Sequence, residues 1–117
     1  MKAANWNTLP KDHFMETACR QFFGTDKVTL VMNTCQPGFP LLMHNHPHEQ
    51  TVYIVDGECD FYVGEEVVRL TPGGLLCIPG DVPHGMQVVG DKPVLNLDVF
   101  YPIREDYLKI ENDLAKG

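Results

Sequence analysis

Short apolar segments separated by turn residues recur along most of this chain, and their spacing constrains the fold more than any other feature of the sequence. Segments rich in Val, Ile, Leu, Tyr and Phe follow one another about every 8–12 residues, which is the repeat of strands joined by tight turns. This pattern is typical of an all-β sandwich or barrel. A closed barrel or a double-sheet jelly roll would remove exposed strand edges.

Glycine, proline and aspartate mark the boundaries of the predicted strands. The dipeptide Asp56-Gly57 is typical of two-residue hairpins, so the strand before it is expected to pair with the strand after it. Leu75–Ile78 is wholly apolar and is interpreted as a buried strand. The segments expected to be extended are residues 13–23, 27–33, 41–46, 50–55, 58–63, 66–70, 75–78, 85–89 and 94–100.

The two ends of the chain differ from its strand-rich middle. Residues 1–12 contain a lone Trp6, and we expect them to form an arm that packs on the barrel or on a neighbouring subunit. Within residues 104–117, apolar side chains lie at helical spacing, which predicts a short C-terminal helix. These apolar residues are Tyr107, Ile110 and Leu114.

The length and charge of the chain limit its organisation and its partners. A chain of 117 residues is long enough for one domain with one core, so residues 1–117 are interpreted as a single domain. The net charge of -7 argues against nucleic acid and anionic membranes as partners, because both reward clustered Lys and Arg. No apolar run approaches the ~18 residues of a membrane span. The N-terminus lacks the apolar core of a signal peptide, so we expect a cytoplasmic location.

Four cysteines lie far apart in the sequence and form no C-x-x-C pair. In a reducing compartment, we expect them to be free thiols that pack as small buried hydrophobic residues. Their spacing also argues against a structural zinc site. They are Cys19, Cys35, Cys59 and Cys77.

The segment from His44 to Gln50 contains a compact group of metal-binding side chains. Alternate residues of an extended strand share one face, so His44, His46 and Gln50 can converge. Neutral imidazole and an amide oxygen suit a divalent first-row metal better than calcium or magnesium. His84 follows two prolines in a second segment and would mean little alone. Together, the two segments predict one metal site.

Two side chains beside these candidate ligands have a different interpretation. His48 has the same parity but lies in the bend at Pro47, so we place it around the site or at its rim rather than on the ion. Glu49 has the opposite parity and is interpreted as a solvated or cross-strand charge.

The spacing of these residues resembles that of the cupin superfamily. Its first motif is G-x5-H-x-H-x3-E-x6-G and its second is G-x5-P-x-G-x2-H-x3-N, and both have counterparts between about residues 28 and 100. The resemblance implies a compact single-domain cupin, a jelly-roll barrel that binds a divalent metal through residues of both motifs. The matching positions are Gly38, His44, His46, Gln50 and Gly57 in the first motif, and Gly73, Pro79 and His84 in the second.

Three positions depart from the cupin motifs. Asp81 replaces a glycine and is acceptable in a turn, while Val88 replaces an asparagine that is not needed as a ligand. Gln50 replaces the acidic ligand. An amide cancels none of the charge of a divalent ion, so the ion keeps its full pull on a substrate oxygen or water. This ligand set also differs from the two-histidine, one-carboxylate site of iron oxygenases.

The last predicted strand alternates aliphatic with other side chains, and its orientation has two interpretations. The alternation alone favours an aliphatic face in the core, formed by Leu95, Leu97 and Val99, with Asp98 in solvent. In the alternative, the aliphatic face packs against a second layer or a subunit, while Asp98 and Phe100 line a ligand cavity.

Arg104, which follows this strand, also has two interpretations. It is either a surface arginine beside Glu105 and Asp106, or a fork that grips a substrate carboxylate in two parallel hydrogen bonds.

Together with the metal motif, the pattern Asp98-x-Phe100-x-x-x-Arg104 resembles the cupins of pectin and alginate degradation that linearise unsaturated uronates. The resemblance implies that Asp98 moves a proton, Phe100 orients the sugar ring and Arg104 fixes the uronate carboxylate. It also implies four metal ligands, namely His44, His46, Gln50 and His84.

Three functions fit the sequence. The first is a metal-dependent isomerase that linearises a 4,5-unsaturated uronate or a related sugar acid. The second is an Fe(II) dioxygenase that acts on a small diketone or aromatic compound, and the third is a non-catalytic metal- or sugar-binding module. Nickel, zinc, manganese and iron all accept the predicted ligands. The resemblance further implies a homodimer, in which Trp6, Leu9 and Phe14 would belong to an exchanged N-terminal arm.

Overall fold

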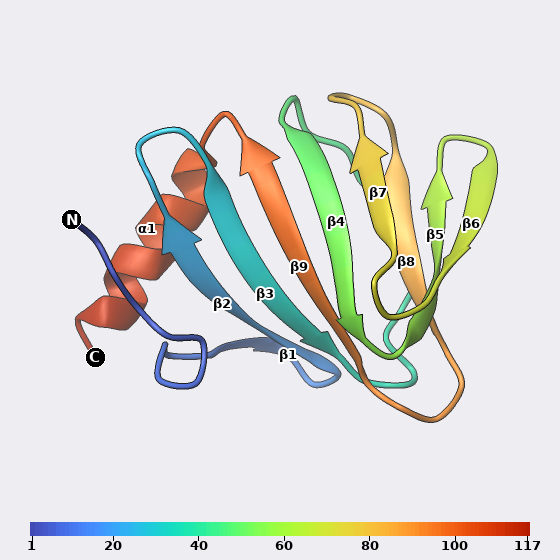
Figure 1. The fold of residues 1–117 in the computed structure, drawn as a ribbon, viewed down its shortest axis with the longest axis horizontal. Coiled ribbons are helices and arrows are strands. Elements are labelled where there is room, and N and C mark those ends of the chain that lie inside the picture. Colours follow the sequence, from blue (N-terminus) through green and yellow to red (C-terminus); the bar gives the residue numbers. More distant parts are fainter.

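The computed structural model describes residues 1–117, and its strands form two antiparallel sheets that pack against each other, with one helix at the side (Figure 1). The larger sheet has the strand order β1-β2-β3-β9-β4-β7, and the smaller has the order β6-β5-β8. The predicted all-β jelly roll with a short C-terminal helix is therefore confirmed. The elements are β1 (Asp12–Met15), β2 (Ala18–Gly24), β3 (Thr29–Cys35), β4 (Glu49–Asp56), β5 (Glu58–Val63), β6 (Glu66–Leu70), β7 (Leu75–Ile78), β8 (His84–Val89), β9 (Val94–Tyr101) and α1 (Glu105–Ala115).

The Asp56-Gly57 turn is a corner between the two sheets, so the predicted hairpin is wrong. β4 pairs with β7 and β9 in the larger sheet, whereas β5 pairs with β6 and β8 in the smaller one. Gly57 has a φ of 84°, and a Cβ atom there would collide with the backbone of Pro93 and Val94. Glycine is required for both reasons. The dipeptide thus marks a sharp turn, but a local signal does not determine which distant strand becomes the partner.

The segment predicted as one strand over residues 13–23 is two strands in the structure. A turn at Glu16-Thr17 separates β1 from β2, and the two strands pair with each other. Residues 41–46 form no strand either. Only His44 pairs there, through an isolated bridge to His84.

β7 is an edge strand, and the prediction that Leu75–Ile78 is buried is wrong for most of it. Leu75 is 68% exposed and Cys77 is also exposed, while Ile78 is fully buried. Exposed and more buried residues alternate along β7, so its exposed side chains belong to the outer face of the sheet, which is open to solvent. Of the other free cysteines, Cys35 and Cys59 are buried as expected and Cys19 is half-buried.

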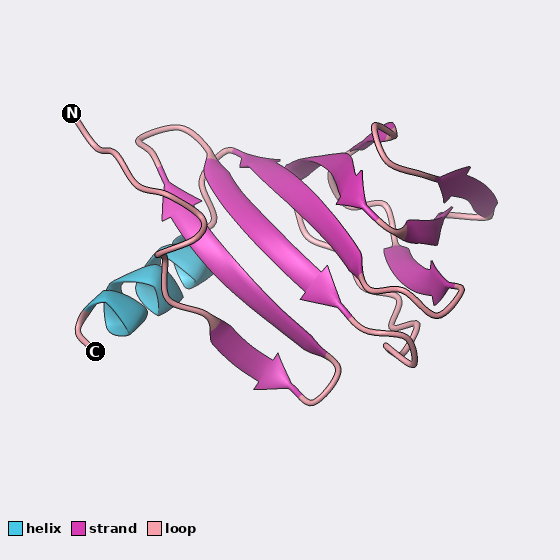
Figure 2. Ribbon diagram, turned by 60° about the horizontal axis from the view of Figure 1, so that its bottom comes forward, coloured by secondary structure: helices cyan, strands magenta, loops and turns pink.

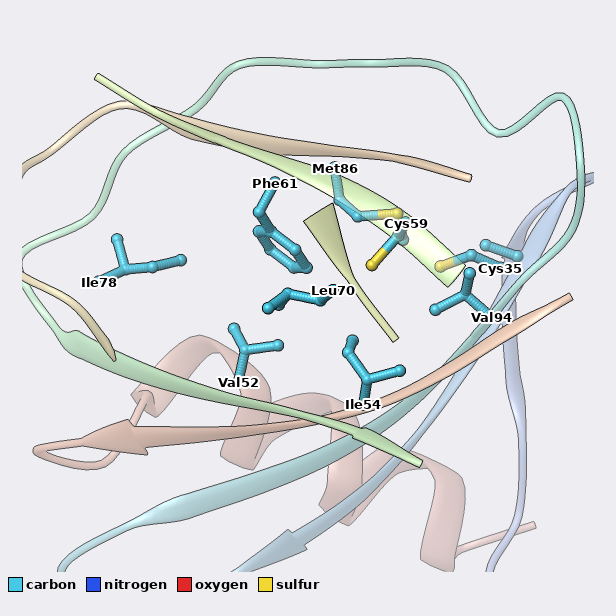
Figure 3. Packing of buried hydrophobic residues seen from close by; sticks show 10 residues of the cluster. Cys35, Val52, Ile54, Cys59, Phe61, Leu70, Ile78, Met86 and Val94 are labelled. Carbon is cyan, nitrogen blue, oxygen red and sulfur yellow. The ribbon is translucent and has the colours of Figure 1, made fainter. Parts of the chain in front are cut away.

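The main hydrophobic core lies between the two sheets. Figure 3 shows Val52 and Ile54 of β4 directed toward Phe61 and Leu70 of the smaller sheet. Burial of such side chains stabilises the fold by roughly 1.5–3 kcal/mol each. The ten buried members of this core are Ala18, Cys35, Val52, Ile54, Cys59, Phe61, Leu70, Ile78, Met86 and Val94.

α1 packs on a second, smaller cluster and lies against one side of the larger sheet (Figure 2). Three apolar residues at helical spacing face the sheet, as the sequence predicts. The buried residues of this cluster are Phe22, Val31 and Phe100, and the helix contributes Tyr107, Ile110 and Leu114. No helix in the structure is long and apolar enough to cross a membrane.

The N-terminal arm packs on β2 and α1 of the same chain. The side-chain amide of Gln21 donates hydrogen bonds to the carbonyl oxygens of Trp6 and Leu9, at 2.6 and 2.9 Å. Lys2 forms an ion pair with Glu111 of α1 at 2.9 Å.

Candidate metal centre and cavity

The two histidine segments are joined directly by backbone hydrogen bonds. The amide of His44 donates to the carbonyl of His84 at 2.9 Å, and the amide of His84 donates back to the carbonyl of His44 at 2.8 Å. The amide of Asp81 donates to the carbonyl of His46 at 2.7 Å. Asp81 has a φ of 67°, a left-handed conformation that aspartate tolerates better than most residues. This conformation explains why an aspartate can stand where the second cupin motif has a glycine.

His44, His46 and His84 converge as predicted, and one ring nitrogen of each lies within 4.8 Å of the other two. In each ring, Nδ1 faces a backbone carbonyl oxygen. The acceptors are Leu42 at 3.0 Å for His44, His48 at 3.0 Å for His46, and Val82 at 2.8 Å for His84. Donation from Nδ1 leaves a lone pair on Nε2, the arrangement that metal-binding histidines usually adopt.

The Nε2 atom of His84 has no hydrogen-bond partner although it is buried. Burial lowers the pKa of His84 to about 4, and it also lowers the pKa of His46. Both rings are therefore neutral at pH 7. A buried lone pair without a donor is costly unless a ligand satisfies it. The cluster suits a divalent metal ion.

Gln50 lies beside this cluster, with Oε1 at 3.1 Å from Nε2 of His46. If Nδ1 of His46 donates to the carbonyl of His48, two acceptor atoms face each other across this distance. A cation between them would satisfy both. Hydrogen bonding by Gln50 also lowers the pKa of Asp98, so the amide links the histidines to this carboxyl group.

His48 and Glu49 lie outside the cluster of three histidines. The ring centroid of His48 is 5.6 Å from that of His46, and its carbonyl oxygen faces Nδ1 of His46. Glu49 is exposed, and its carboxylate lies 3.6 Å from Sγ of Cys77.

Asp98 faces the interior of the sandwich, so the interpretation that placed it in solvent is wrong. Asn96, Asp98 and Phe100 are buried, whereas the aliphatic residues between them are only partly buried. The reason is that apolar side chains project from both faces of the larger sheet, so alternation alone does not distinguish the inner face from the outer face. β9 turns its polar residues inward because that face lines a cavity.

Two asparagines hold the carboxyl group of Asp98. Asn33 donates to Oδ2 and Asn96 donates to Oδ1, each at 2.9 Å. Burial raises the pKa of Asp98 to about 7, and hydrogen bonds from Gln50, Asn33 and Asn96 offset part of this effect. A carboxyl group in this state can exchange protons near neutral pH.

The cavity has a volume of about 350 Å³ and lies between both sheets and α1. This is within the usual range for small-molecule sites, which combine apolar walls with a few placed polar groups. Its lining includes six of the predicted site residues, namely His44, Gln50, His84, Asp98, Phe100 and Arg104.

Arg104 lines the cavity and pairs with Asp106, the neighbouring acid that the surface interpretation named, but it is not a surface residue, and its binding of a substrate carboxylate stays a prediction. Nε and Nη2 donate to the two carboxylate oxygens of Asp106 at 3.2 and 2.8 Å. The side chain is only 13% exposed, and its guanidinium lies over the rings of Phe100 and Tyr107.

Three polar residues of the cavity were missed by the sequence reasoning. Arg20, Asn33 and Tyr107 all line it. Arg20 alternates with the buried Phe22, but the opposite face of β2 carries the apolar Phe23, so parity alone does not identify it. Asn33 could not be found from the sequence either, since its neighbour on β9 becomes known only from the strand order.

Comparison with known protein families gives a match over more than half of the chain. Residues 31–100 match the family model described as "Cupin domain". No curated protein matches the chain.

Several solved structures have the same fold. An RmlC-like cupin from Shewanella frigidimarina NCIMB 400 is 25% identical with a TM-score of 0.83, covering 92% of this chain and 96% of that one. KdgF from Halomonas sp. is 22% identical with a TM-score of 0.83, covering 92% and 98%. The polyketide cyclase RemF from Streptomyces resistomycificus is 19% identical with a TM-score of 0.73, covering 87% and 79%.

Proposed function

This chain belongs to the cupin domain family, and from that premise we propose that it is a metal-dependent isomerase that linearises a 4,5-unsaturated uronate or a related sugar acid. One observation carries the proposal. Asp98, a buried carboxyl group with a pKa of about 7, lines the same cavity as His44, His84 and Arg104. Acid–base, metal-binding and anion-binding groups therefore surround one small space.

The residues present fit a divalent transition metal such as nickel, zinc, manganese or iron. His44, His46 and His84 would hold it through Nε2, and Gln50 would hold it through Oε1. When bound, the ion polarises oxygen atoms of the substrate. Because all four side chains are neutral, none of them reduces its charge.

Asp98 is the proposed proton-transfer group. Linearisation converts a cyclic enol ether into an open keto-aldehyde of the same atomic composition, so it requires proton transfer and no oxidant. The protonated form, which burial favours, can deliver a proton from the carboxyl oxygen, and the carboxylate can then take one back. Asn33 and Asn96 fix both oxygens and so orient this transfer.

Phe100 and Arg104 are proposed to orient the sugar acid. Phe100 is 3% exposed and offers an apolar wall for the ring of the substrate. The guanidinium carbon of Arg104 lies 4.9 Å from the centroid of that aromatic ring. A positive charge in this position attracts the carboxylate of a uronate.

The test is the ultraviolet absorbance of 4,5-unsaturated galacturonate, which is lost when the double bond is consumed. We expect the full-length protein, loaded separately with each of the four metals, to remove this absorbance faster than buffer containing the same metal. Protein that gives no acceleration with any of the four would contradict the proposal.

Further assays on the same metal-loaded protein distinguish the isomerase from the two other functions. An Fe(II) dioxygenase would consume oxygen and stop under nitrogen, whereas the isomerase would run at an undiminished rate. A non-catalytic module would bind the sugar acid without turnover, and Asp98→Ala would then remove no activity.

We also propose that the protein is a homodimer. On the outer face of the larger sheet, Tyr53 lies between Leu97 of β9 and Leu75 of β7. Tyr53 and Leu75 are 40% and 68% exposed, so this surface is an apolar strip that a second copy could bury. Light scattering at micromolar concentration should give twice the 13.2 kDa chain mass. Leu75→Glu should yield a monomer and the control Val67→Glu should not; a monomeric unmodified protein would contradict the proposal.

A further inference from the structure

Arg20 is a second arginine in the cavity wall, and the proposed reaction assigns it no part. It lies on β2, directly opposite Asn33 of β3, which in turn lies opposite Asn96 of β9. These two asparagines hold Asp98, so Arg20 continues the polar row beside the proposed proton-transfer group. Its side chain is 18% exposed and lines the cavity.

The guanidinium group of Arg20 is held in place but keeps free donors. Its carbon lies 4.2 Å from the ring centroid of Phe14 and 5.1 Å from that of Tyr107. Nε donates to a carboxylate oxygen of Asp12 at 2.9 Å. Nη1 and Nη2 make no hydrogen bond within the chain, and each carries N–H groups that suit a carboxylate.

Arg104 offers fewer free donors than Arg20. Its Nε and Nη2 both donate to Asp106, which occupies one whole edge of the guanidinium fork. A substrate carboxylate would have to share or displace Asp106 to bind that edge. The Nη1–Nη2 edge is open at both arginines, but at Arg104 one of its nitrogens, Nη2, also bonds Asp106, whereas at Arg20 both terminal nitrogens are free.

Aromatic contacts connect Arg20 to the histidine cluster. The ring of Tyr107 lies 3.8 Å from the guanidinium carbon of Arg104 and 5.1 Å from that of Arg20. The ring of Phe100 lies 5.6 Å from Tyr107 and 5.4 Å from His46. One wall thus runs from His46 past Phe100 and Arg104 to Tyr107 and Arg20.

We propose that Arg20 binds the carboxylate of the substrate through its Nη1–Nη2 edge, while Arg104 remains paired with Asp106 and contributes its charge. The choice of a sugar acid as ligand rests on the proposed function. Two parallel charge-assisted hydrogen bonds from a preordered fork give the strength and orientation that a uronate requires.

The test compares the binding of galacturonate and galactose to the metal-loaded protein by calorimetry, because these two sugars differ at the carboxylate. The unmodified protein should prefer galacturonate, and Arg20→Gln should reduce this preference roughly tenfold to a hundredfold. Arg69→Gln is the matched control, since Arg69 is an exposed arginine paired with Asp60 and lies outside the cavity. The control should keep the full preference.

Arg20→Lys covers the case in which Arg20→Gln fails to fold. Lysine keeps the charge beside Asp12 but loses the two-pronged edge, so the preference for galacturonate should still fall. A preference retained in Arg20→Lys, or equal binding of the two sugars by the unmodified protein, would overturn the inference. So would a preference that depends on Arg104 and not on Arg20.

The outcomes separate this inference from the proposed reaction. If the absorbance of the unsaturated uronate persists while Arg20 governs the galacturonate preference, the reaction is wrong and the carboxylate site stands. If the reaction proceeds and Arg20→Gln changes neither KM nor the preference, the reaction stands and the carboxylate site is wrong.

Discussion

β4 and β9 each contribute to two very different parts of the same sandwich. Toward the end of β4 and the start of β9, Ile54 and Val94 are fully buried in the hydrophobic core. Toward the opposite ends of these antiparallel strands, Gln50 and Phe100 pair directly and face the cavity. Within about 4 residues, or ~13 Å of strand, the inward surface changes from apolar packing to buried polar chemistry.

The burial of side chains has a different effect on stability in each of the two parts. In the core, the buried side chains are aliphatic, aromatic or sulfur-containing, and their removal from water adds to stability. Around the cavity, a carboxyl group has a pKa of about 7 and Nε2 of His84 is buried without a partner. Both features cost free energy in the isolated chain, and function is the simplest reason for a fold to retain them. Substitutions in the core should therefore lower the stability of the fold, and substitutions around the cavity should lower catalytic activity or metal binding.

Replacement of Asp98 gives the largest expected effect. Asp98→Asn keeps the shape of the side chain but removes the carboxyl group that gives and takes the proton, so turnover of unsaturated galacturonate should fall by about 10²–10⁴. Metal content, measured on the same samples, should not change. Asp60→Asn on β5 is the control and should retain full turnover, because Asp60 pairs with Arg69 outside the cavity. Equal rates for Asp98→Asn and the unmodified protein would remove Asp98 from the mechanism.

Replacement of Ile54 should show the opposite pattern. Ile54 is 0% exposed, and Ile54→Ala should lower the free energy of unfolding by about 2–5 kcal/mol because it leaves a cavity in the core. The folded variant should still bind metal with unchanged affinity. Urea denaturation and metal titration measure the two effects, with Val67→Ala as an exposed control. Loss of metal binding by folded Ile54→Ala would show that the two parts are not independent.

The pH dependence of stability should reveal the cost of burying Asp98. The pKa of Asp98 rises from 3.8 to about 7 on folding. Its contribution to the free energy of unfolding is therefore fully present below pH 3.8 and is lost as the pH rises through 7. In metal-free protein, Asp98→Asn should gain stability relative to the unmodified chain by roughly 3 kcal/mol between pH 4.5 and 7.5. His84, whose pKa is lowered to about 4, is present in both proteins and cancels. Urea denaturation of both proteins at the two pH values measures this gain. A difference in stability between the two proteins that is the same at both pH values would refute the prediction.

The comparison of the two parts also explains what the sequence could predict. His44, His46 and His84 converge because backbone hydrogen bonds join the two short segments that carry them, and the spacing of the histidines along the chain carries that information. The strand order of the sheets is not encoded locally, so the sequence predicted a hairpin at Asp56-Gly57 where the chain crosses between sheets.

The orientation of β9 could not be predicted for a related reason. One face lines the cavity and the other carries half-buried aliphatic side chains, so the alternation of Leu97 with Asp98 had two solutions. The network around Asp98 depends on Asn33, which joins it only through the pairing of β3 with β9. Arg20 was missed for the same reason, because the adjacent Phe22 and Phe23 give both faces of β2 an apolar side chain.

Metal binding should produce the smallest change that still separates the two parts. A metal that binds only the folded state should add about 3 kcal/mol to the free energy of unfolding at about 100 times its Kd. His44→Ala should abolish this gain, and because His44 is exposed, the metal-free variant should fold normally. His48→Ala should retain the gain, since His48 lies outside the cluster of three histidines. Urea denaturation with and without chelator measures the gain, and its persistence in His44→Ala would mean that the ion binds elsewhere. The backbone carbonyl that faces Nδ1 of His46 is kept in His48→Ala, so loss of the gain in this variant would mean that the imidazole of His48 itself takes part in metal binding.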